Sequence, residues 1–477
     1  MPESLKKKTV KGVAWTSLDK LTGIGFGFVI GVILARLLSP SDYGLLAMIG
    51  VFNAIAFAFL DSGFCNALVR KPDLTEDDNT TAFCFNIVAG LVLFGIIWLI
   101  APWVSKFYDK PILTPLLRAE GSLLIISSFT FVQSTQLMRA LNFKAKMIVR
   151  VTSNVLGGVI GIISAYKGLG VWALVVMHIA SALISVLMLW IISPWRPRGR
   201  WSKASFNYLW GYGSKLLASN LLNTIYGNIY PIIIGKFYSA ADLGQYTRAK
   251  QYANMPSETL TSVLQQVTFP VLSKIQGDTV RLGDSYRRML RFTVFIVFPV
   301  MLGMAALAYP LVITLVTDKW AECVPYLQVI CIASMWYPVH AINLNLLQVK
   351  GRSDLFLRLE IIKKVIVTAV IFVCVPFGIM GICVGAVFTS VVCLAINTYY
   401  TGKLIHVGFL RQMMDMTPTL LNALAMGAVV YLVTIPLSSE WLKLVVGIPV
   451  GMAFYIAVAW LFRLPELKEA LDIVHRR

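Results

Sequence analysis

Polar side chains recur at helical spacing in two stretches of the chain whose other residues are largely apolar. The run over 206–235 carries them four, four, three and four residues apart, at Lys215, Ser219, Asn223, Tyr226 and Tyr230. The run over 242–272 carries them at Arg248, Gln251, Asn254, Glu258, Thr261 and Gln265. Residues three or four apart share one helical face, so each run predicts a polar stripe. Inside a membrane such a stripe either lines a hydrated cavity or forms a hydrogen-bond network between helices. The length of these two stripes favours the cavity.

Several cations also lie at or within apolar runs. They can hold an anionic head group, because phosphate oxygens accept charge-assisted hydrogen bonds from Lys and Arg. The alternative is that they reach the interface or pair with a nearby carboxylate. The predicted substrate cavity comprises Lys20, Arg118, Lys215, Ser219, Asn223, Tyr226, Arg248, Lys250, Gln251 and Asn254. Asp61 and Glu258 are the candidates for ion coupling, because intramembrane carboxylates often serve as proton relays.

Patterns typical of metal, nucleotide and disulfide sites do not occur in this sequence. The four histidines are scattered, and none of the seven cysteines belongs to a Cys-x-x-Cys pair, so neither a metal site nor a disulfide framework is predicted. There is no Walker A sequence, so direct use of ATP is not expected. We predict no catalytic residue and no cofactor, and leave open a coupling proton or sodium ion.

The composition shows which elements must position these residues. The 477 residues are 57% hydrophobic and only 14% charged, with a mean hydropathy of +0.74, which excludes a soluble globular protein. The chain is predicted to be an all-α, polytopic membrane protein, because about 14 apolar runs reach the roughly 20 residues that a membrane span needs. The runs cover residues 13–38, 43–68, 80–104, 113–138, 147–166, 170–193, 206–235, 242–272, 290–316, 322–348, 355–376, 379–402, 416–436 and 441–462.

One short motif occurs twice, in residues 33–46 and again in 233–246. Each copy places a cation at the end of an apolar run, then Ser-x-x-Asp-x-Gly, then a new run. Ser39 and Ser239 can stop one helix, and Asp42 and Asp242 can cap the next. Each copy joins the first two runs of one half of the chain. This predicts an internal duplication, with parallel repeats related by an axis along the membrane normal.

The distribution of Lys and Arg predicts the orientation. With the N-terminus inside, 28 of the 42 Lys and Arg residues fall in inward segments and six in outward connections. This bias places both termini in the cytoplasm, and it accounts for the net charge of +19 without a nucleic-acid partner. The connections are too short for a soluble catalytic domain, so the chain is not expected to be an enzyme.

The predicted organisation follows from these runs and from the basic stretch after the sixth of them. It consists of a six-helix bundle over 1–193, a basic cytoplasmic linker over 194–205, a second six-helix bundle over 206–402, two additional transmembrane helices over 416–462 and a cytoplasmic tail over 463–477. The substrate cavity is expected between the two bundles.

The first copy of the repeated motif carries a family resemblance. Residues 34–44, which read Leu-Ala-Arg-Leu-Leu-Ser-Pro-Ser-Asp-Tyr-Gly, resemble the first external turn of Wzx-type polysaccharide flippases, which belong to the multidrug/oligosaccharidyl-lipid/polysaccharide exporter superfamily. Residues 269–274 look like the Pro-x-x-Ser ending of their eighth span, and residues 317–320 and 350–352 are similar to further landmarks. The resemblance covers nearly the whole chain, and the colanic-acid exporter type is the most similar subgroup.

The resemblance implies a function that the residues alone do not. It implies two bundles around a cationic cavity, alternating access, and transport of an undecaprenyl-pyrophosphate-linked oligosaccharide from the inner to the outer leaflet of the bacterial cytoplasmic membrane. The implied partners are membrane lipids, a polysaccharide polymerase and glycosyltransferases. Three alternatives remain. They are a multidrug or toxin extruder, which would need acidic groups in its cavity, a peptidoglycan-precursor flippase, and a membrane glycan polymerase or ligase, which would need a sizeable external loop.

Overall fold

The computed structural model describes residues 3–61 and 63–475, and every regular element in that part of the chain is helical. By their contacts, residues 1–244 and 245–477 form two compact units, called unit 1 and unit 2 below and described separately. The helices of unit 1 are α1 (Glu3–Leu37), α2 (Pro40–Asp61), α3 (Phe64–Arg70), α4 (Glu76–Phe107), α5 (Leu113–Ser128), α6 (Phe131–Arg139), α7 (Phe143–Tyr166), α8 (Val171–Ile192), α9 (Lys203–Gly227) and α10 (Ile229–Phe237).

Unit 2 contains the rest of the chain. Its elements are α11 (Ala240–Lys274), whose first turn still belongs to unit 1, α12 (Thr279–Ala306), α13 (Ala308–Val316), η1 (Asp318–Trp320), α14 (Cys323–Ser334), α15 (Tyr337–Val349), α16 (Ser353–Cys374), η2 (Val375–Phe377), α17 (Gly378–Ile405), α18 (Phe409–Thr434), α19 (Glu440–Leu461) and α20 (Pro465–His475). The division falls after Gly244, beyond the predicted linker over 194–205. The bundle boundaries drawn from the sequence stay a prediction.

The apolar helices confirm a polytopic membrane protein. Ten helical stretches of the described residues are long and apolar enough to cross a membrane, and the bent pair α5 and α6 adds an eleventh. The count omits α9 and α11, whose polar stripes lower their hydropathy, and α10, which is apolar but has only nine residues. It joins α16 and α17 into one stretch, Asp354–Ile405. Each of the predicted runs coincides with a helix or with a broken pair of helices.

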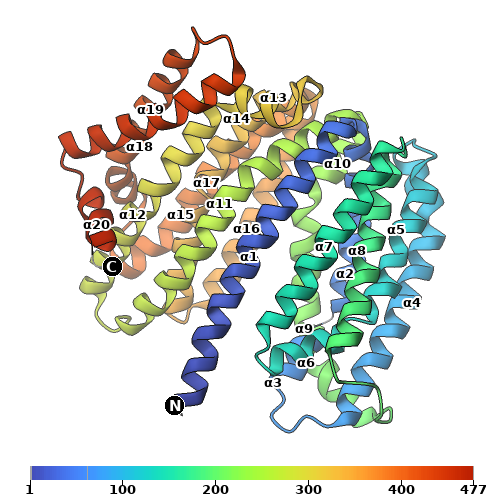
Figure 1. Cartoon of the computed structure of the whole chain (residues 1–477). Coiled ribbons are helices and arrows are strands. Elements are labelled where there is room, and N and C mark those ends of the chain that lie inside the picture. Colours follow the sequence, from blue (N-terminus) through green and yellow to red (C-terminus); the bar gives the residue numbers. More distant parts are fainter. Residues whose placement is uncertain (1–2, 62, 476–477) are drawn as a thin grey trace. The chain divides into compact units, whose positions relative to one another are not determined.

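In unit 1, α1 packs on α7, α7 on α8, α8 on α5 and α5 on α4, while α2 contacts α5, α8 and α9 (Figure 1). The glycines of α7 allow α8 to approach closely. A Cβ atom added at Gly157 would lie 1.8 Å from Ser181 Oγ, and one at Gly161 would lie 2.7 Å from Met177 Cβ. Small residues at a helix interface are the usual basis of packing in a membrane, where no hydrophobic effect drives helices together.

In unit 2, α12 packs on α14 and α18, and α17 packs on α14, α15 and α16. The last pair of long helices, α18 and α19, attaches to α12 through one polar side chain of each helix. Arg287 of α12 donates two hydrogen bonds of 2.6 Å to the Asp415 carboxylate of α18, and the Tyr455 hydroxyl of α19 donates to the Phe295 carbonyl at 2.9 Å. Figure 1 shows this pair at the edge of unit 2.

The two copies of the repeated motif form the same turn. In both, the serine hydroxyl accepts a hydrogen bond from the aspartate N–H, and the aspartate carboxylate accepts from the serine N–H and hydroxyl. The Ser39 N–H donates to Asp42 Oδ2 at 2.9 Å, and the Ser239 N–H donates to Asp242 Oδ2 at 3.1 Å. This reciprocal arrangement is a capping box. The serines are therefore the N-caps, and the aspartates complete the box from the third position of the next helix.

The two turns also pack against each other, in unit 1, through their glycines. A Cβ atom added at Gly44 would lie 1.7 Å from the Ala240 carbonyl oxygen, and one added at Gly244 would lie 1.8 Å from the Pro40 carbonyl oxygen. Each glycine therefore lies against the backbone at the start of the other copy's helix, and only glycine allows this approach. The predicted duplication thus extends to a reciprocal contact between the copies.

The basic linker is held against the start of α4. The Gly199 N–H donates to Thr80 Oγ1 at 3.1 Å, the Arg200 N–H to Asp77 Oδ1 at 2.8 Å and the Ser202 N–H to Thr81 Oγ1 at 3.0 Å. The acceptors are polar side chains in the first two turns of α4, so hydrogen bonds fix the linker to the surface of unit 1.

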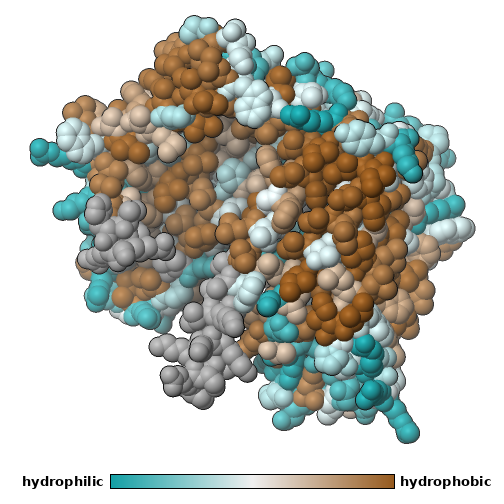
Figure 2. Space-filling model, viewed as in Figure 1, coloured by the Kyte–Doolittle hydropathy of each residue, from teal (hydrophilic) through white to brown (hydrophobic). Residues whose placement is uncertain are grey.

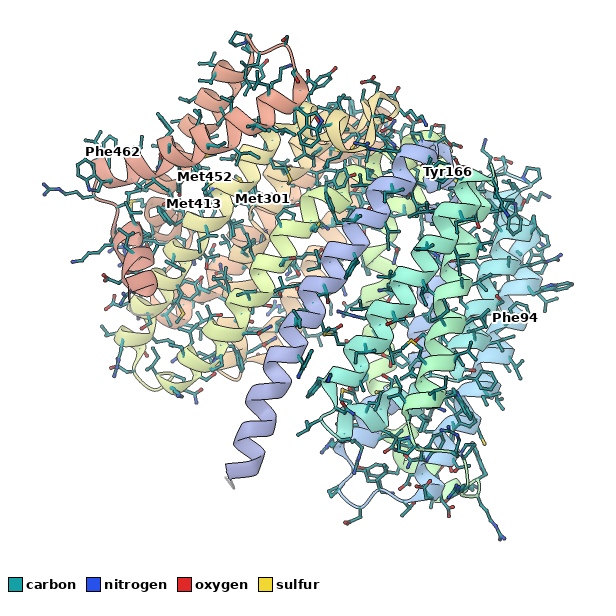
Figure 3. All side chains as sticks on the ribbon, viewed as in Figure 1. Phe94, Tyr166, Met301, Met413, Met452 and Phe462 are labelled. Carbon is teal, nitrogen blue, oxygen red and sulfur yellow. The ribbon has the colours of Figure 1, made fainter. Side chains whose placement is uncertain are left out.

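The outer surfaces suit a lipid environment. Hydrophobic side chains cover the middle of the visible face of each unit, and hydrophilic ones gather toward the ends of the helices (Figure 2). Tyr166 at the end of α7 and Phe462 after α19 project away from their own units (Figure 3) and are 73% and 71% exposed. Aromatic side chains at helix ends are typical of the membrane–water interface.

Candidate functional site

An open cavity of about 480 Å³ lies in unit 1 between α2 and α9. Its wall consists of Ala54, Phe57, Ala58 and Asp61 from α2 and Asn220, Asn223 and Thr224 from α9. Two of the predicted residues, Asp61 and Asn223, are therefore brought together here from positions far apart in the sequence. The small side chains of Ala54 and Ala58 leave the space that the polar groups of α9 face. The wall offers carboxylate, amide and hydroxyl groups for hydrogen bonding, and none of its described residues is a cation.

The other predicted residues of α9 lie along the same helix. Ser219 is exposed and Tyr226 is half-buried. The side chain of Lys215 lies outside the part of the structure that is described, so its predicted role stays a prediction. Asn220 and Thr224, which the spacing rule did not select, are one residue from the predicted stripe and widen it on the side that faces α2.

On α11 the predicted cation Arg248 is buried and held by protein groups. The residue is 4% exposed. Its Nη1 donates to Gln251 Oε1 at 3.0 Å, and its guanidinium lies 5.0 Å from the centre of the Trp320 ring and 5.7 Å from that of Tyr252. Stacking on aromatic faces is a geometry that suits Arg and not Lys. Arg248 and Gln251, both predicted for the site, are therefore joined by a hydrogen bond from a buried cation to an exposed amide.

The middle of α11 carries a second group of predicted residues. The Asn254 amide donates to Glu258 Oε1 at 3.1 Å and accepts from Ser334 Oγ of α14, also at 3.1 Å. The Ser257 hydroxyl donates to the Ser334 carbonyl at 2.8 Å. Glu258 itself is exposed. This part of the stripe is thus a hydrogen-bond network to a neighbouring helix that leaves one carboxylate accessible.

The remaining predicted cations have different surroundings. Lys20 is exposed on α1, and Lys250 is half-buried on α11, where it interacts electrostatically with Glu258. Arg118 of α5 lies 3.9 Å from the centre of the Trp98 ring and donates to the Trp98 carbonyl at 3.3 Å. Neither Lys20 nor Arg118 is part of the wall between α2 and α9. Among the described residues no cluster of His, Cys, Asp and Glu could hold a metal ion.

Unit 2 also contains an apolar groove of about 490 Å³ between α12, α13, α18 and α19. Gly303, Gly447 and Gly451 leave room in its walls, and Met304, Met426 and Met452 line it. A groove with almost purely hydrocarbon walls on a membrane-spanning unit can accept a hydrocarbon chain and not a sugar.

One polar pair was not predicted from the sequence as a site. Glu120 of α5 is 5% exposed, and its Oε1 lies 2.7 Å from Nδ1 of His178 on α8. A histidine and a glutamate inside apolar runs are each a signal of function. Their pairing could not be found without knowing that α5 packs on α8.

Comparisons with known proteins identify the family. Residues 33–325 match the family described as polysaccharide biosynthesis protein. The chain is 25% identical over 401 residues to the lipopolysaccharide biosynthesis protein WzxC of Escherichia coli K12, covering 82% of this chain and 80% of the relative. It is 23% identical over 485 residues to the succinoglycan biosynthesis transport protein ExoT of Rhizobium meliloti, covering 100% and 98% of the two chains.

A solved structure supports the same fold. The lipid II flippase MurJ in an inward closed conformation superimposes with a TM-score of 0.73 over 95% of this chain and 98% of that one, at 13% sequence identity. That level of identity shows the fold alone. Together with the match over 33–325, it confirms the assignment drawn from the repeated motif. The chain belongs to the polysaccharide biosynthesis protein family, which agrees with the resemblance to Wzx-type polysaccharide flippases.

Proposed function

We propose that the protein moves an undecaprenyl-pyrophosphate-linked oligosaccharide from the inner to the outer leaflet of the bacterial cytoplasmic membrane, for export of a surface polysaccharide. The observation that carries this proposal is the polar cavity between α2 and α9 in an otherwise apolar set of helices. Asp61, Asn220, Asn223 and Thr224 present hydrogen-bond acceptors and donors, which is what the hydroxyl groups of a glycan require.

The cargo has two further chemical parts, and each fits a feature of the chain. Its pyrophosphate needs a cation, and Arg248 and Lys250 are the intramembrane cations of α11, with Lys215 on α9 as a third. Its isoprenoid chain needs a hydrocarbon surface, and the groove between α12, α13, α18 and α19 has such walls. The proposed mechanism is alternating access, in which the polar groups shelter the sugar while the lipid stays in contact with hydrocarbon.

The proposal includes the orientation. The excess of Lys and Arg in the segments predicted to face inward supports cytoplasmic N- and C-termini. A membrane-bound glycosyltransferase would supply the cargo on the cytoplasmic side, and a polymerase would use it on the other side. These two are the proposed partners, together with the lipids of the membrane.

The experiment that tests the proposal is deletion of the gene followed by measurement of lipid-linked oligosaccharide on each membrane face. We expect surface glycan to disappear and the lipid-linked precursor to accumulate on the cytoplasmic face, and we expect the wild-type gene to reverse both effects. Unchanged surface glycan without accumulation would overturn the proposal. A complementing N220A/N223A variant should export less glycan at normal protein level, whereas Ser122→Ala, whose hydroxyl bonds only to Ala119 of its own helix, should export normally.

One observation favours a second candidate, the multidrug or toxin extruder. Among the described residues, the wall of the cavity between α2 and α9 has an acidic group, Asp61, and no cation, which would also suit a cationic drug. The same deletion strain separates the two functions. If the protein is an extruder, the deletion strain should be inhibited by a lower concentration of lipophilic cations and should keep its surface glycan. If it is the proposed flippase, the strain should lose its surface glycan and keep the wild-type inhibitory concentration. A peptidoglycan-precursor flippase would instead make deletion lethal.

A further inference from the structure

We propose that Glu120 and His178 form the site at which this transporter binds and releases its coupling proton. The inference rests on the proposed function, since a proton site is useful only to a protein that moves a cargo. Glu120 Oε1 lies 2.7 Å from His178 Nδ1. The second carboxylate oxygen, Oε2, is buried and has no hydrogen-bond partner among the described residues. The side chain of His178 is 38% exposed and that of Glu120 only 6%.

The pair lies at membrane depth. Glu120 is the eighth residue of α5 and His178 the eighth residue of α8, so each is about 10 Å from the first residue of its helix at 1.5 Å per residue. The two helices pack against each other. A carboxylate at this depth is costly in free energy and is retained where it serves a function. The buried carboxylate together with the partly exposed imidazole gives a proton an entry point and a place to reside.

No other charge neutralises the pair. The helices that pack on α5 or α8 are α2, α4, α6 and α7, and their charged side chains lie within the first two turns or the last turn of each helix. These side chains are Asp42, Asp61, Glu76, Asp77, Asp78, Lys106, Arg139, Lys144, Lys146 and Arg150, and the neutral titratable ones are Tyr43, Cys84 and Tyr166. None of them forms an ion pair with Glu120 in the part of the chain that the structure describes. Arg118, two residues away on α5, stacks on Trp98 instead.

Binding of one proton therefore changes the charge of the pair from −1 to zero. Without the proton, a neutral imidazole donates its Nδ1–H to the Glu120 carboxylate. With it, the added hydrogen is carried either by Nε2 of His178 or by Oε2 of Glu120, and no other bond is made or broken. A pair that is neutral in one form and charged in the other can bias a conformational equilibrium, because burial disfavours the charged form.

The two carboxylates predicted for ion coupling are in a different setting. Asp61 lines the open cavity beside Asn220 and Asn223, and Glu258 is exposed and bonded to Asn254. Both are therefore accessible to cargo. Glu120 is shielded by protein, and its polar partner among the described residues, His178, can exchange a proton, which is the arrangement that a dedicated coupling site requires.

The test uses the deletion strain complemented with wild type, Glu120→Gln or His178→Gln. Surface glycan export is measured with nigericin, which collapses the pH gradient, and with valinomycin and potassium, which collapse the electrical potential. We expect nigericin to slow export by the wild type, because a loss of one pH unit removes a tenfold difference in proton concentration between the two sides of the membrane. The two variants should be slow without nigericin and should not respond to it. Glu322→Gln, which changes an exposed carboxyl before α14, is the matched control and should behave like the wild type.

The outcomes separate the two proposals. If the wild-type gene is expressed and does not restore export, the proposed function is wrong. If it restores export and Glu120→Gln exports at the same rate with the same response to nigericin, the proton site is wrong and the flippase function stands. If Glu120→Gln loses export and its protein level is also reduced, the loss would reflect misfolding of the variant and not loss of the proton site. A second measurement on purified protein therefore tests the pair directly.

That measurement is an NMR spectrum of the histidine ring nitrogens in lipid nanodiscs at one fixed pH. The chain has only four histidines, so His178→Gln assigns the signal. Glu120→Gln should move the His178 ring signals, because Nδ1 loses its charged partner at 2.7 Å. The signals of the other three histidines should not move. His178 signals that are the same with and without the Glu120 charge would overturn the proposal.

Discussion

The helices that follow the two repeated turns, α2 and α11, begin alike and then differ. Positions 200 residues apart pair Met48 with Arg248, Ala54 with Asn254 and Ala58 with Glu258. In α2 these residues are buried or line a cavity with small apolar side chains. In α11 the equivalent residues are a buried cation, an amide bonded to a neighbouring helix and an accessible carboxylate.

The difference shows how a duplicated fold can acquire a site. The turns are preserved because each glycine lies against the other copy's backbone, and a side chain there would clash. About three to four turns further along, no such constraint operates. The first copy leaves space at Ala54 and Ala58, and α9 supplies the polar groups that face it. At the equivalent positions the second copy has polar side chains of its own, Asn254 and Glu258. Structural symmetry is therefore kept at the contact between the copies and lost where we propose that cargo binds.

The largest effect is expected from the shared part. Gly44→Ala and Gly244→Ala would each place a Cβ atom less than 2 Å from a carbonyl oxygen of the other turn, so the backbone must move. Overpacking of this kind costs about 1–3 kcal/mol, and we expect the upper end because backbone and not a flexible side chain is in the way. Thermal unfolding in detergent measures the loss.

A matched control lies on the same helix as Gly44. A Cβ atom at Gly50 would meet nothing within 4 Å, so Gly50→Ala should leave the melting temperature unchanged or raise it, since alanine favours a helix by up to about 1 kcal/mol. If Gly44→Ala and Gly50→Ala have the same melting temperature, the contact between the turns does not constrain the fold.

The second-largest effect is expected from a substitution that gives the second copy the residue found in the first. Arg248→Met installs the residue that the first copy has at the buried position 48. If Arg248 is a cation for the pyrophosphate, export should fall about tenfold or more, because a hydrogen bond to a charged group contributes about 1.5–3 kcal/mol. The melting temperature should change little, since methionine fills the space. Export is measured as surface glycan in the deletion strain.

Arg248→Lys sharpens this result. It keeps the charge and loses the planar group that stacks on Trp320 and Tyr252. We expect partial export from Arg248→Lys and almost none from Arg248→Met. If both variants are unstable and neither can be purified, Arg248 serves to hold η1 and α11 together, and the cation for the cargo must be sought at Lys215 or Lys250.

The sequence predicted the helices and the repeated turn because both depend on local patterns. Hydropathy located the apolar runs, and the Ser-x-x-Asp-x-Gly spacing located the capping boxes. Hydropathy did not locate the breaks within runs, such as the one at Gly63, where a φ of 70° separates α2 from α3. A broken helix keeps the composition of a continuous one, so only backbone geometry shows it.

The site was predicted less completely, for a physical reason. Spacing shows which residues share a helical face and does not show what that face meets. Asn223 of the α9 stripe lines a cavity, whereas Asn254 of the α11 stripe bonds to Ser334 of α14. Contacts between helices far apart in the chain, such as that of Glu120 with His178, carry no local signal and appear only in the fold.

A moderate effect is expected where α11 forms that network. Asn254→Ala, which again copies the first half of the chain, removes the bonds to Glu258 and Ser334. Two hydrogen bonds of this kind contribute about 1–3 kcal/mol together, so the melting temperature should fall. Ser334→Ala should cost about half as much. Thr259→Ala is the control, because its hydroxyl bonds only to the Met255 carbonyl of its own helix. A double variant that equals the sum of the two single ones would show that the residues do not interact.

The smallest effect should be the same in both copies. Asp42→Ala and Asp242→Ala each remove the acceptor of two hydrogen bonds from the capping serine, and loss of a cap costs about 1 kcal/mol. Because the two boxes have nearly equal distances, the two melting temperatures should fall together, with Ser41→Ala as the control. Asp42 also lies close to Gly170, in the loop before α8, because a Cβ atom added at Gly170 would be 3.2 Å from Asp42 Oδ1. A larger fall in melting temperature for Asp42→Ala than for Asp242→Ala would therefore mean that Asp42 also stabilises this loop. The two turns would then differ in their contacts although their capping boxes are alike.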